Sequence, residues 1–227
     1  MKKVFFAFIL SVLGLSASAA DWPNIARYDS LNNVVRQLPA EQRRVVFFGN
    51  SITEGWPKAH PGFFSDNGFI GRGISGQTSY QFLVRFRGDA IELQPQVIVI
   101  NAATNDVAEN THPYNGDRTF SNIVSLVQLT QANGIQPVMS TVLPAAKFGW
   151  APAITDAPDK IESLNKRLEA YAKANGIPFI DYYSVLVSPD GSRALNPAYT
   201  KDGVHPTADG YTVMEKAALD VITPLLK

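Results

Sequence analysis

Three side chains near the two ends of the chain have the types and spacing needed for nucleophilic catalysis. Ser51 closes the apolar run RVVFFGNS, and Asp202 and His205 lie together in KDGVHP. A serine hydroxyl is a weak nucleophile at neutral pH, and it reacts when a histidine takes its proton and a carboxylate orients that histidine. A spacing of three residues can place the carboxylate of Asp202 against Nδ1 of His205, so that Nε2 faces the serine. We therefore predict Ser51 as nucleophile, His205 as base and Asp202 as the group that orients the base.

Acyl transfer also requires donors for the negative charge that develops on the substrate's carbonyl oxygen, and one donor contributes about 3 kcal/mol of transition-state stabilisation. We predict three donors: the backbone N–H of Ser51, the backbone N–H of Gly76 and the side-chain amide of Asn105. Glycine suits a loop that approaches a ligand closely. Asn105 follows an apolar run that can hold its amide in place.

Each of these residues also has a simpler explanation. Ser51 and Asn105 could cap the helices that follow them, Gly76 could serve only a turn, and Asp202 with His205 could form an exposed ion pair of small energetic value. The order Ser, Asp, His is that of α/β-hydrolases, but their G-x-S-x-G motif is missing. It is the combination of all these residues, at the ends of successive strands and in one late loop, that favours a site.

The elements that must position these residues alternate along the chain. Apolar runs of strand length cover residues 44–50, 69–76, 97–101, 135–144 and 177–186, the last of which is expected to run from a strand into a loop. Segments with helical spacing of apolar residues cover 25–38, 77–93, 119–134, 159–176 and 207–226. Two of these helices end at a glycine, Gly134 and Gly176, directly before the next strand. This alternation predicts an α/β fold with a parallel sheet and helices on both faces, and ligands bind such sheets beyond the carboxyl ends of the strands.

The first twenty residues differ from the rest of the chain. Residues 1–20 contain two lysines, an apolar run and then Ala17-Ser18-Ala19, which is the pattern of a secretory signal peptide and too short for a membrane span. We expect an exported protein, periplasmic or extracellular, without stable membrane insertion. The chain has no cysteine and three scattered histidines, so we expect neither disulfides nor a catalytic metal.

The charge balance argues against one class of partner. The chain has 20 Lys and Arg against 20 Asp and Glu, and this equality gives no basic excess for nucleic acid.

Four blocks in this order resemble the SGNH hydrolases, also called the GDSL esterase/lipase family. They are GNSIT (49–53), GISGQTS (73–79), ATND (103–106) and DGVHP (202–206). The resemblance implies a flavodoxin-like three-layer α/β/α sandwich with a five-stranded parallel sheet, formed by one domain over residues 21–227. It implies the same roles for Ser51, Asp202 and His205 and the same oxyanion donors, and it implies no cofactor.

Two positions depart from the usual family pattern. Asn50 replaces the aspartate of Gly-Asp-Ser, which keeps the shape of the side chain and removes a charge. Ala103 replaces the glycine of Gly-Thr-Asn-Asp, so we expect its φ angle to be negative or its backbone to be strained. Neither residue transfers a proton.

We therefore predict a secreted serine esterase that removes small acyl groups, acetyl above all, from carbohydrate esters through an acyl-enzyme. A lysophospholipase or thioesterase-type acylhydrolase and a noncatalytic glycan-binding module are the alternatives. Trp56, Phe63, Phe64 and Trp150 are candidates for the substrate cleft, with core packing equally able to explain the two phenylalanines. His60 and His112 are expected in solvent or at the substrate rim. Arg72 and Arg85 are expected in partly exposed ion pairs, with anion binding as the alternative.

Overall fold

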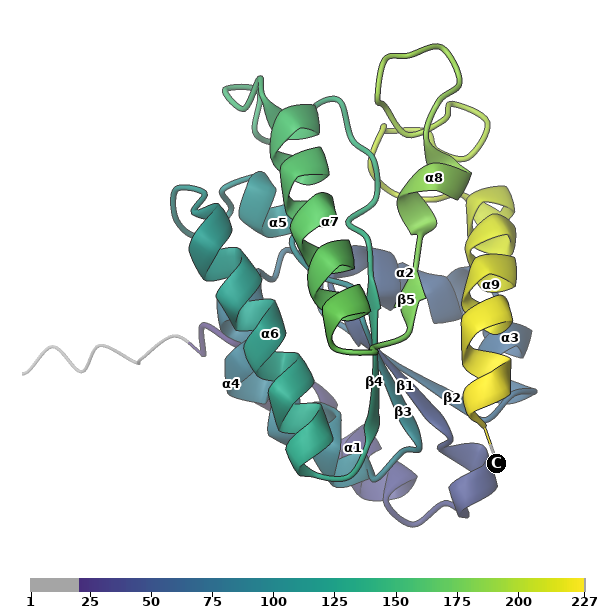
Figure 1. Cartoon of the computed structure of the whole chain (residues 1–227). Helices are drawn as coiled ribbons and strands as arrows, with labels where there is room; N and C mark the ends of the chain where they lie inside the picture. The colour runs from purple at the N-terminus through teal and green to yellow at the C-terminus, as the bar shows by residue number, and fades with distance from the viewer. Residues whose placement is uncertain (1–20, 227) are drawn as a thin grey trace, which may run out of the picture.

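The computed structural model describes residues 21–226 and contains a five-stranded, all-parallel sheet. The predicted signal peptide, residues 1–20, lies outside the described residues. The spatial order of the strands is β2-β1-β3-β4-β5, and helices cover both faces of the sheet (Figure 1). The strands are β1 (Val45–Gly49), β2 (Phe69–Gly73), β3 (Val97–Ile100), β4 (Gln136–Ser140) and β5 (Phe179–Ile180). The predicted flavodoxin-like α/β/α fold is confirmed.

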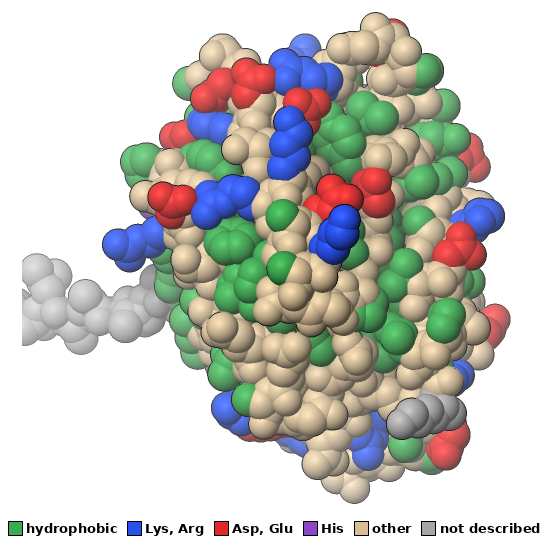
Figure 2. Space-filling view, in the orientation of Figure 1, with side chains coloured by type: hydrophobic (Ala, Val, Ile, Leu, Met, Phe, Trp, Pro, Cys, Tyr) green, Lys and Arg blue, Asp and Glu red, His purple; other side chains and the backbone are tan. Residues whose placement is uncertain are grey.

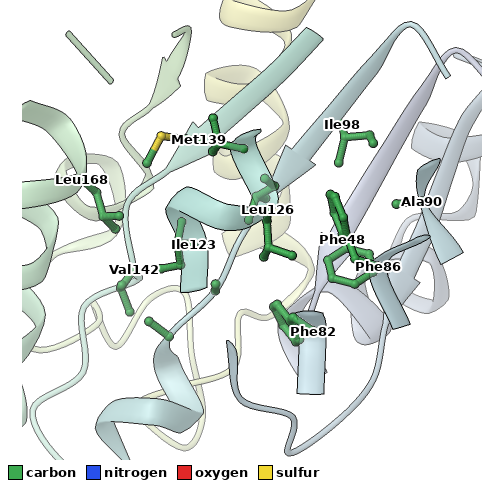
Figure 3. Close-up of a cluster of buried hydrophobic side chains, with 14 of the residues drawn as sticks. Phe48, Phe82, Phe86, Ala90, Ile98, Ile123, Leu126, Met139, Val142 and Leu168 are labelled. Carbon is green, nitrogen blue, oxygen red and sulfur yellow. The ribbon is translucent and has the colours of Figure 1, made fainter. Parts of the chain in front are cut away.

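The strands are apolar throughout because both faces of the sheet are covered. Successive side chains of a strand point to opposite faces, so Val46 and Phe48 enter one core and Val45 and Phe47 enter the other. The first core packs against α4 (Ser79–Asp89), α6 (Gly116–Ala132) and α7 (Ala157–Ala174). Figure 3 shows Phe48 beside Phe82 and Phe86 of α4 in this core.

The second core lies on the opposite face of the sheet. There the strands pack against α2 (Ser51–Ala59), α3 (Pro61–Ser65), α8 (Tyr182–Leu186) and α9 (Ala208–Ile222). The remaining elements are the short helices α1 (Asp29–Val35) and α5 (Thr104–Val107) and the 3₁₀ segments η1 (Ile25–Tyr28), η2 (Ala40–Gln42), η3 (Ile91–Leu93) and η4 (Thr223–Leu225). None of the helices among the described residues is both long and apolar enough to cross a membrane.

The helix ends follow the chemistry expected from the sequence. Gly134 and Gly176 follow α6 and α7 with φ angles of 71° and 63°, a conformation that glycine adopts without strain. Thr207 caps α9, and its side chain accepts the N–H of Gly210.

The bounds of several predicted elements differ from the structure, and two of these differences have a clear local cause. The helix expected over 25–38 is divided into η1 and α1, because Tyr28 leaves the helical region with φ −112° and ψ 3°. The segment 177–186, expected as a strand that runs into a loop, has only two residues in the sheet and then forms a helix. The side chain of Asp181 accepts the N–H of Ser184 and begins α8 there, since such caps favour a helix over continued strand.

The order of the strands decides where the predicted site residues lie. β1 lies between β2 and β3, so the segments that follow these three strands meet at one edge of the sheet. Gly73 lets β2 end directly against α2, because a Cβ at this position would lie 2.1 Å from the backbone nitrogen of Glu54.

Candidate active site

Ser51 stands at the junction between β1 and α2, where its hydroxyl is free to face another segment. The cap of α2 is Asn50, whose side-chain oxygen accepts the N–H of Ile52 at 3.1 Å. Ser51 is the first residue of the helix, so its own N–H has no acceptor within the helix. The simpler explanation of Ser51 as the capping residue therefore does not hold.

The hydroxyl of Ser51 meets the C-terminal histidine. Its Oγ lies 2.9 Å from Nε2 of His205, and Nδ1 of His205 lies 2.7 Å from Oδ2 of Asp202. The other carboxylate oxygen, Oδ1, accepts the backbone N–H groups of His205 at 2.8 Å and Val204 at 2.9 Å. The side chains of His205 and Asp202 are 38% and 53% exposed, so the group lies at the surface, open to large molecules.

The surroundings of Asp202 keep it charged. Partial burial by itself raises the pKa of this carboxyl, but the backbone N–H and ring of His205 and the N–H of Val204 lower it to about 2. A permanent carboxylate at this position holds the imidazole with its proton on Nδ1 and leaves Nε2 able to accept a proton from Ser51.

The three predicted oxyanion donors lie at the ends of neighbouring strands. Gly76 follows β2 with a φ angle of 77°, and its N–H donates to no backbone carbonyl among residues 21–226. The amide of Asn105, after β3, is fixed at both ends: Nδ2 donates to the carbonyl of Gln77 at 2.9 Å, and Oδ1 accepts Nδ2 of Asn110 at 3.1 Å. One hydrogen of the Asn105 Nδ2 group therefore stays available for a ligand.

The residues that depart from the family pattern are both buried behind this edge. Ala103 has φ 81° and ψ −13°, so the strained alternative of the prediction is the one observed. Asn50 caps α2 through its oxygen, while its Nδ2 has no hydrogen-bond partner among the described residues.

Of the aromatic candidates for a substrate cleft, only Trp150 is placed beside the site. Its ring centroid lies 6.1 Å from that of His205, and the residue is 47% exposed. Trp56, Phe63 and Phe64 are buried in the second core, so a cleft role is wrong for Trp56, and core packing explains the two phenylalanines.

His60 and His112, expected in solvent or at the substrate rim, are partly buried and contact other side chains, and the surroundings of the two arginines differ from those predicted. Nδ1 of His60 lies 2.6 Å from Glu215, and His112 packs on the ring of Tyr80. Arg72 and Arg85 are buried, so neither forms the partly exposed ion pair that was predicted.

Arg85 ties the strand ends together from inside the protein. It donates to the carbonyls of Gly49 and Arg72 and to the side chains of Gln77 and Asp89. Burial lowers the pKa of its guanidinium to about 10. No residue pattern predicts this role of Arg85, because the role depends on which loops the fold brings around its side chain.

No group of three or more His, Cys, Asp or Glu side chains within residues 21–226 is arranged to hold a metal ion. The polar groups that meet at this edge of the sheet are Ser51, His205, Asp202 and the neighbouring N–H donors.

Comparison with known proteins identifies the family. Residues 47–213 match the model of the GDSL-like lipase/acylhydrolase family, which is more than half of the chain. The chain belongs to this family. It is a GDSL-type ester hydrolase, and all four sequence blocks lie within the matched residues.

Two solved members of the family are similar over nearly their whole length. A protein of Bacteroides fragilis described as an acylhydrolase is 60% identical, with a TM-score of 0.88 over 91% of this chain and 99% of its own. A GDSL-like lipase of Bacteroides thetaiotaomicron is 57% identical, with a TM-score of 0.87 over 90% of this chain and 99% of its own.

A more distant relative carries a more specific name. An acetylxylan esterase of Xylanibacter ruminicola is 23% identical over 79% of this chain, and the match spans 44% of that protein's length. A lipoprotein of Bacillus subtilis, YqeF, is 24% identical over 70% of this chain and 79% of its own.

Proposed function

We propose that the protein is an exported serine esterase that removes acetyl groups from carbohydrate esters. The observation that carries the proposal is the contact between Ser51 Oγ and His205 Nε2 at 2.9 Å, with Asp202 on the far side of the ring. This is the arrangement in which an imidazole can take the serine proton and hold the resulting charge.

The reaction proceeds in two halves. Ser51 Oγ attacks the ester carbonyl carbon while its proton passes to Nε2 of His205, and the N–H groups of Ser51 and Gly76 and the amide of Asn105 bind the oxyanion. The carbon–oxygen bond to the alcohol then breaks, and His205 returns the proton to the departing oxygen. In the second half, water gives a proton to His205 and attacks the acyl carbon. The bond between that carbon and Ser51 Oγ then breaks, His205 returns the proton to Oγ, and the acid is released.

Two features support a carbohydrate alcohol with a small acyl group. Trp150 offers an exposed aromatic face beside His205, and aromatic rings of this kind pack well against the apolar face of a sugar. The partial exposure of His205 and Asp202 leaves room for a bulky alcohol. The acetylxylan esterase among the relatives supports the same substrate class.

The proposal includes export to the periplasm or the medium, with residues 1–20 as a signal peptide and one catalytic domain after it. The relative that is a lipoprotein supports a location outside the cytoplasm. The present chain contains no cysteine, so a lipid on an N-terminal cysteine is not part of the proposal.

Hydrolysis of p-nitrophenyl esters from acetate to decanoate tests this function. We expect the highest kcat/KM for acetate and a steady fall with chain length. Ser51→Ala should lower kcat at least about 1,000-fold, because the nucleophile is gone. Ser125→Ala is the matched control and should behave as wild type, since the Ser125 hydroxyl bonds only its own helix at Ser121.

The same assay separates the alternatives. If the rate rises with the length of the acyl chain, the acetyl preference is rejected and a lysophospholipase or thioesterase-type activity is favoured. Equal rates for wild type and Ser51→Ala would remove the enzyme mechanism and favour a glycan-binding module.

A further inference from the structure

Residues 22–28 lie against the loop that carries Gly76, and we call this segment the N-terminal strap. Two of its carbonyls accept side-chain amides from the end of this loop, residues 74–78, and from the first turn of α4: Pro23 accepts Nε2 of Gln77 at 2.6 Å, and Trp22 accepts Nε2 of Gln81 at 2.7 Å. At the near end of the loop, the hydroxyl of Tyr28 donates to the carbonyl of Gly73. The strap therefore holds the loop at the start and at the end.

A third contact reaches the middle of the loop through α2. Arg27 lies 2.7 Å from Oε1 of Glu54, and the other oxygen of that carboxylate accepts both the N–H and the hydroxyl of Ser75. Burial alone raises the pKa of Glu54, but the two bonds from Ser75 and the charges of Lys58 and Arg27 lower it. Glu54 thus stays a carboxylate that fixes the residue preceding Gly76.

Gln77 connects the strap with the oxyanion donors. Its side chain is buried and uses both ends, since Oε1 accepts Nε of Arg85 and Nε2 donates to Pro23. Its backbone carbonyl accepts the amide of Asn105 at 2.9 Å. A shift of Gln77 would therefore move two donors together: the N–H of Gly76, its chain neighbour, and the Asn105 amide.

The strap is anchored at Tyr28, which is buried with the guanidinium of Arg72 4.7 Å from its ring centroid, and the start of the strap is more open. Its regular structure is a single 3₁₀ turn over Ile25–Tyr28, and Trp22 and Ile25 are both about half exposed. An oxyanion donor is effective only when it is held in place before the charge develops. The hydrogen bonds between the strap and the loop can hold the donors in place in this way.

We infer that the N-terminal strap, acting through Gln77 and Glu54, positions the Gly76 N–H and the Asn105 amide for oxyanion binding. Gln77 is a positioning residue that does not touch the substrate. The inference rests on the proposed function, because it assigns a purpose to a loop whose donors that function uses.

Amide hydrogen exchange tests the structural half of the inference without any substrate. In a variant that lacks residues 21–24, the carbonyls of Trp22 and Pro23 are gone, and we expect the amides of residues 74–78 to exchange at least about tenfold faster. Arg27→Ala is a milder second variant, which we expect to fold normally because the Arg27 side chain is 46% exposed, and it should accelerate exchange at Ser75 and Gly76. Arg36→Ala is the control, since Arg36 is also a partly exposed arginine paired with an acid, Glu92, but lies away from the loop.

Kinetics and inhibitor binding test the catalytic half. With p-nitrophenyl acetate, the deletion should lower kcat about tenfold and leave KM within twofold, because the donors act in the transition state; loss of a whole donor would cost about 100-fold or more. Affinity for phenylboronic acid, whose tetrahedral adduct with serine places an oxygen at the same donors, should fall by the same factor. Gln77→Glu keeps the acceptor for Arg85 and loses the donor for Pro23, so it should reproduce the deletion.

The outcomes separate the inference from the proposed function. Inactivity of the wild type would reject the proposed function, and the exchange data would still report whether the strap holds the loop. Unchanged exchange at residues 74–78 would overturn the strap. Faster exchange with unchanged kcat and boronic acid affinity, measured below the melting temperature of each variant, would reduce the strap to a structural role and overturn the inference as well.

Discussion

At the scale of single residues, Ala103 is the clearest conflict between local preference and the site. It lies between β3 and α5 with a φ angle of 81°, in a region that disfavours side chains with a Cβ by about 1–2 kcal/mol. The turn directs Asn105 toward Gln77. Strain of this kind persists where the surrounding structure fixes it, and it clusters at functional sites.

We predict that Ala103→Gly destabilises the protein less than the same change at Ala145. Both alanines are about 1% exposed, and Ala145 does not have a positive φ angle. Each substitution loses a buried methyl, about 0.8 kcal/mol, and adds backbone freedom to the unfolded chain, about 0.5–1 kcal/mol. At Ala103 the relief of strain offsets about 1 kcal/mol of this loss.

Urea unfolding of both variants measures the difference. The free energy of unfolding should be about 1 kcal/mol higher for Ala103→Gly than for Ala145→Gly. Equal values, or a lower value at Ala103, would mean that the positive φ angle stores no strain.

The residues proposed to carry out the reaction could be predicted from the sequence, but the residues that hold the oxyanion donors in place could not. Ser51, Asp202 and His205 could be predicted as a group because their chemistry requires one another, and the structure brings them together. Their catalytic role stays a prediction. Gln77, Asn110 and Arg85 carry no such chemical signature, because a hydrogen bond to a distant carbonyl depends on the fold alone.

At the scale of elements, α4 shows how a neighbouring loop can determine where a helix begins. Its cap, Thr78, forms a reciprocal pair with Gln81. The buried carboxylate of Asp106 accepts the N–H and the hydroxyl of Ser79, the first residue of the helix, and also Oγ1 of Thr119 in α6. One carboxylate thus joins the segment that carries Asn105 to two helices.

We predict that Asp106→Ala lowers the free energy of unfolding by about 2–3 kcal/mol. The substitution leaves the Ser79 N–H and two hydroxyls buried without their acceptor, and each such loss is worth about 1–3 kcal/mol before the structure relaxes. Asp117→Ala is the control, because this acid is almost fully exposed in its pair with Arg167 and should change stability by less than about 0.5 kcal/mol. A loss no larger than that of the control would show that α4 does not depend on Asp106.

The elements themselves were more predictable than their exact extents. Runs such as residues 97–101 are apolar because both faces of the sheet are buried, and that requirement is visible in the sequence. The end of β5 could not be predicted, because a short buried strand and a buried helix both appear in the sequence as an apolar stretch. The cap at Asp181 decides between them.

At the scale of the whole molecule, the fold brings together residues that are 154 positions apart in the chain. The switch in strand order places the segments after β1, β2 and β3 side by side, and the loop before α9 supplies His205 from the opposite end of the chain. On the face shown in Figure 2, acidic and basic side chains lie intermixed with apolar ones. This pattern agrees with the equal numbers of the two charges, and the absence of a nucleic-acid partner stays a prediction.

The most direct test of the account is covalent labelling with p-nitrophenyl methylphosphonate followed by peptide mass spectrometry. Attack by the activated serine displaces p-nitrophenol and leaves a methylphosphonyl group on the oxygen. We predict one modified site, at Ser51 in the tryptic peptide 45–58, with labelling at least about 100-fold slower in His205→Ala. A label on a different residue, or loss of esterase activity while Ser51 stays unmodified, would contradict the central claim that Ser51 is the nucleophile.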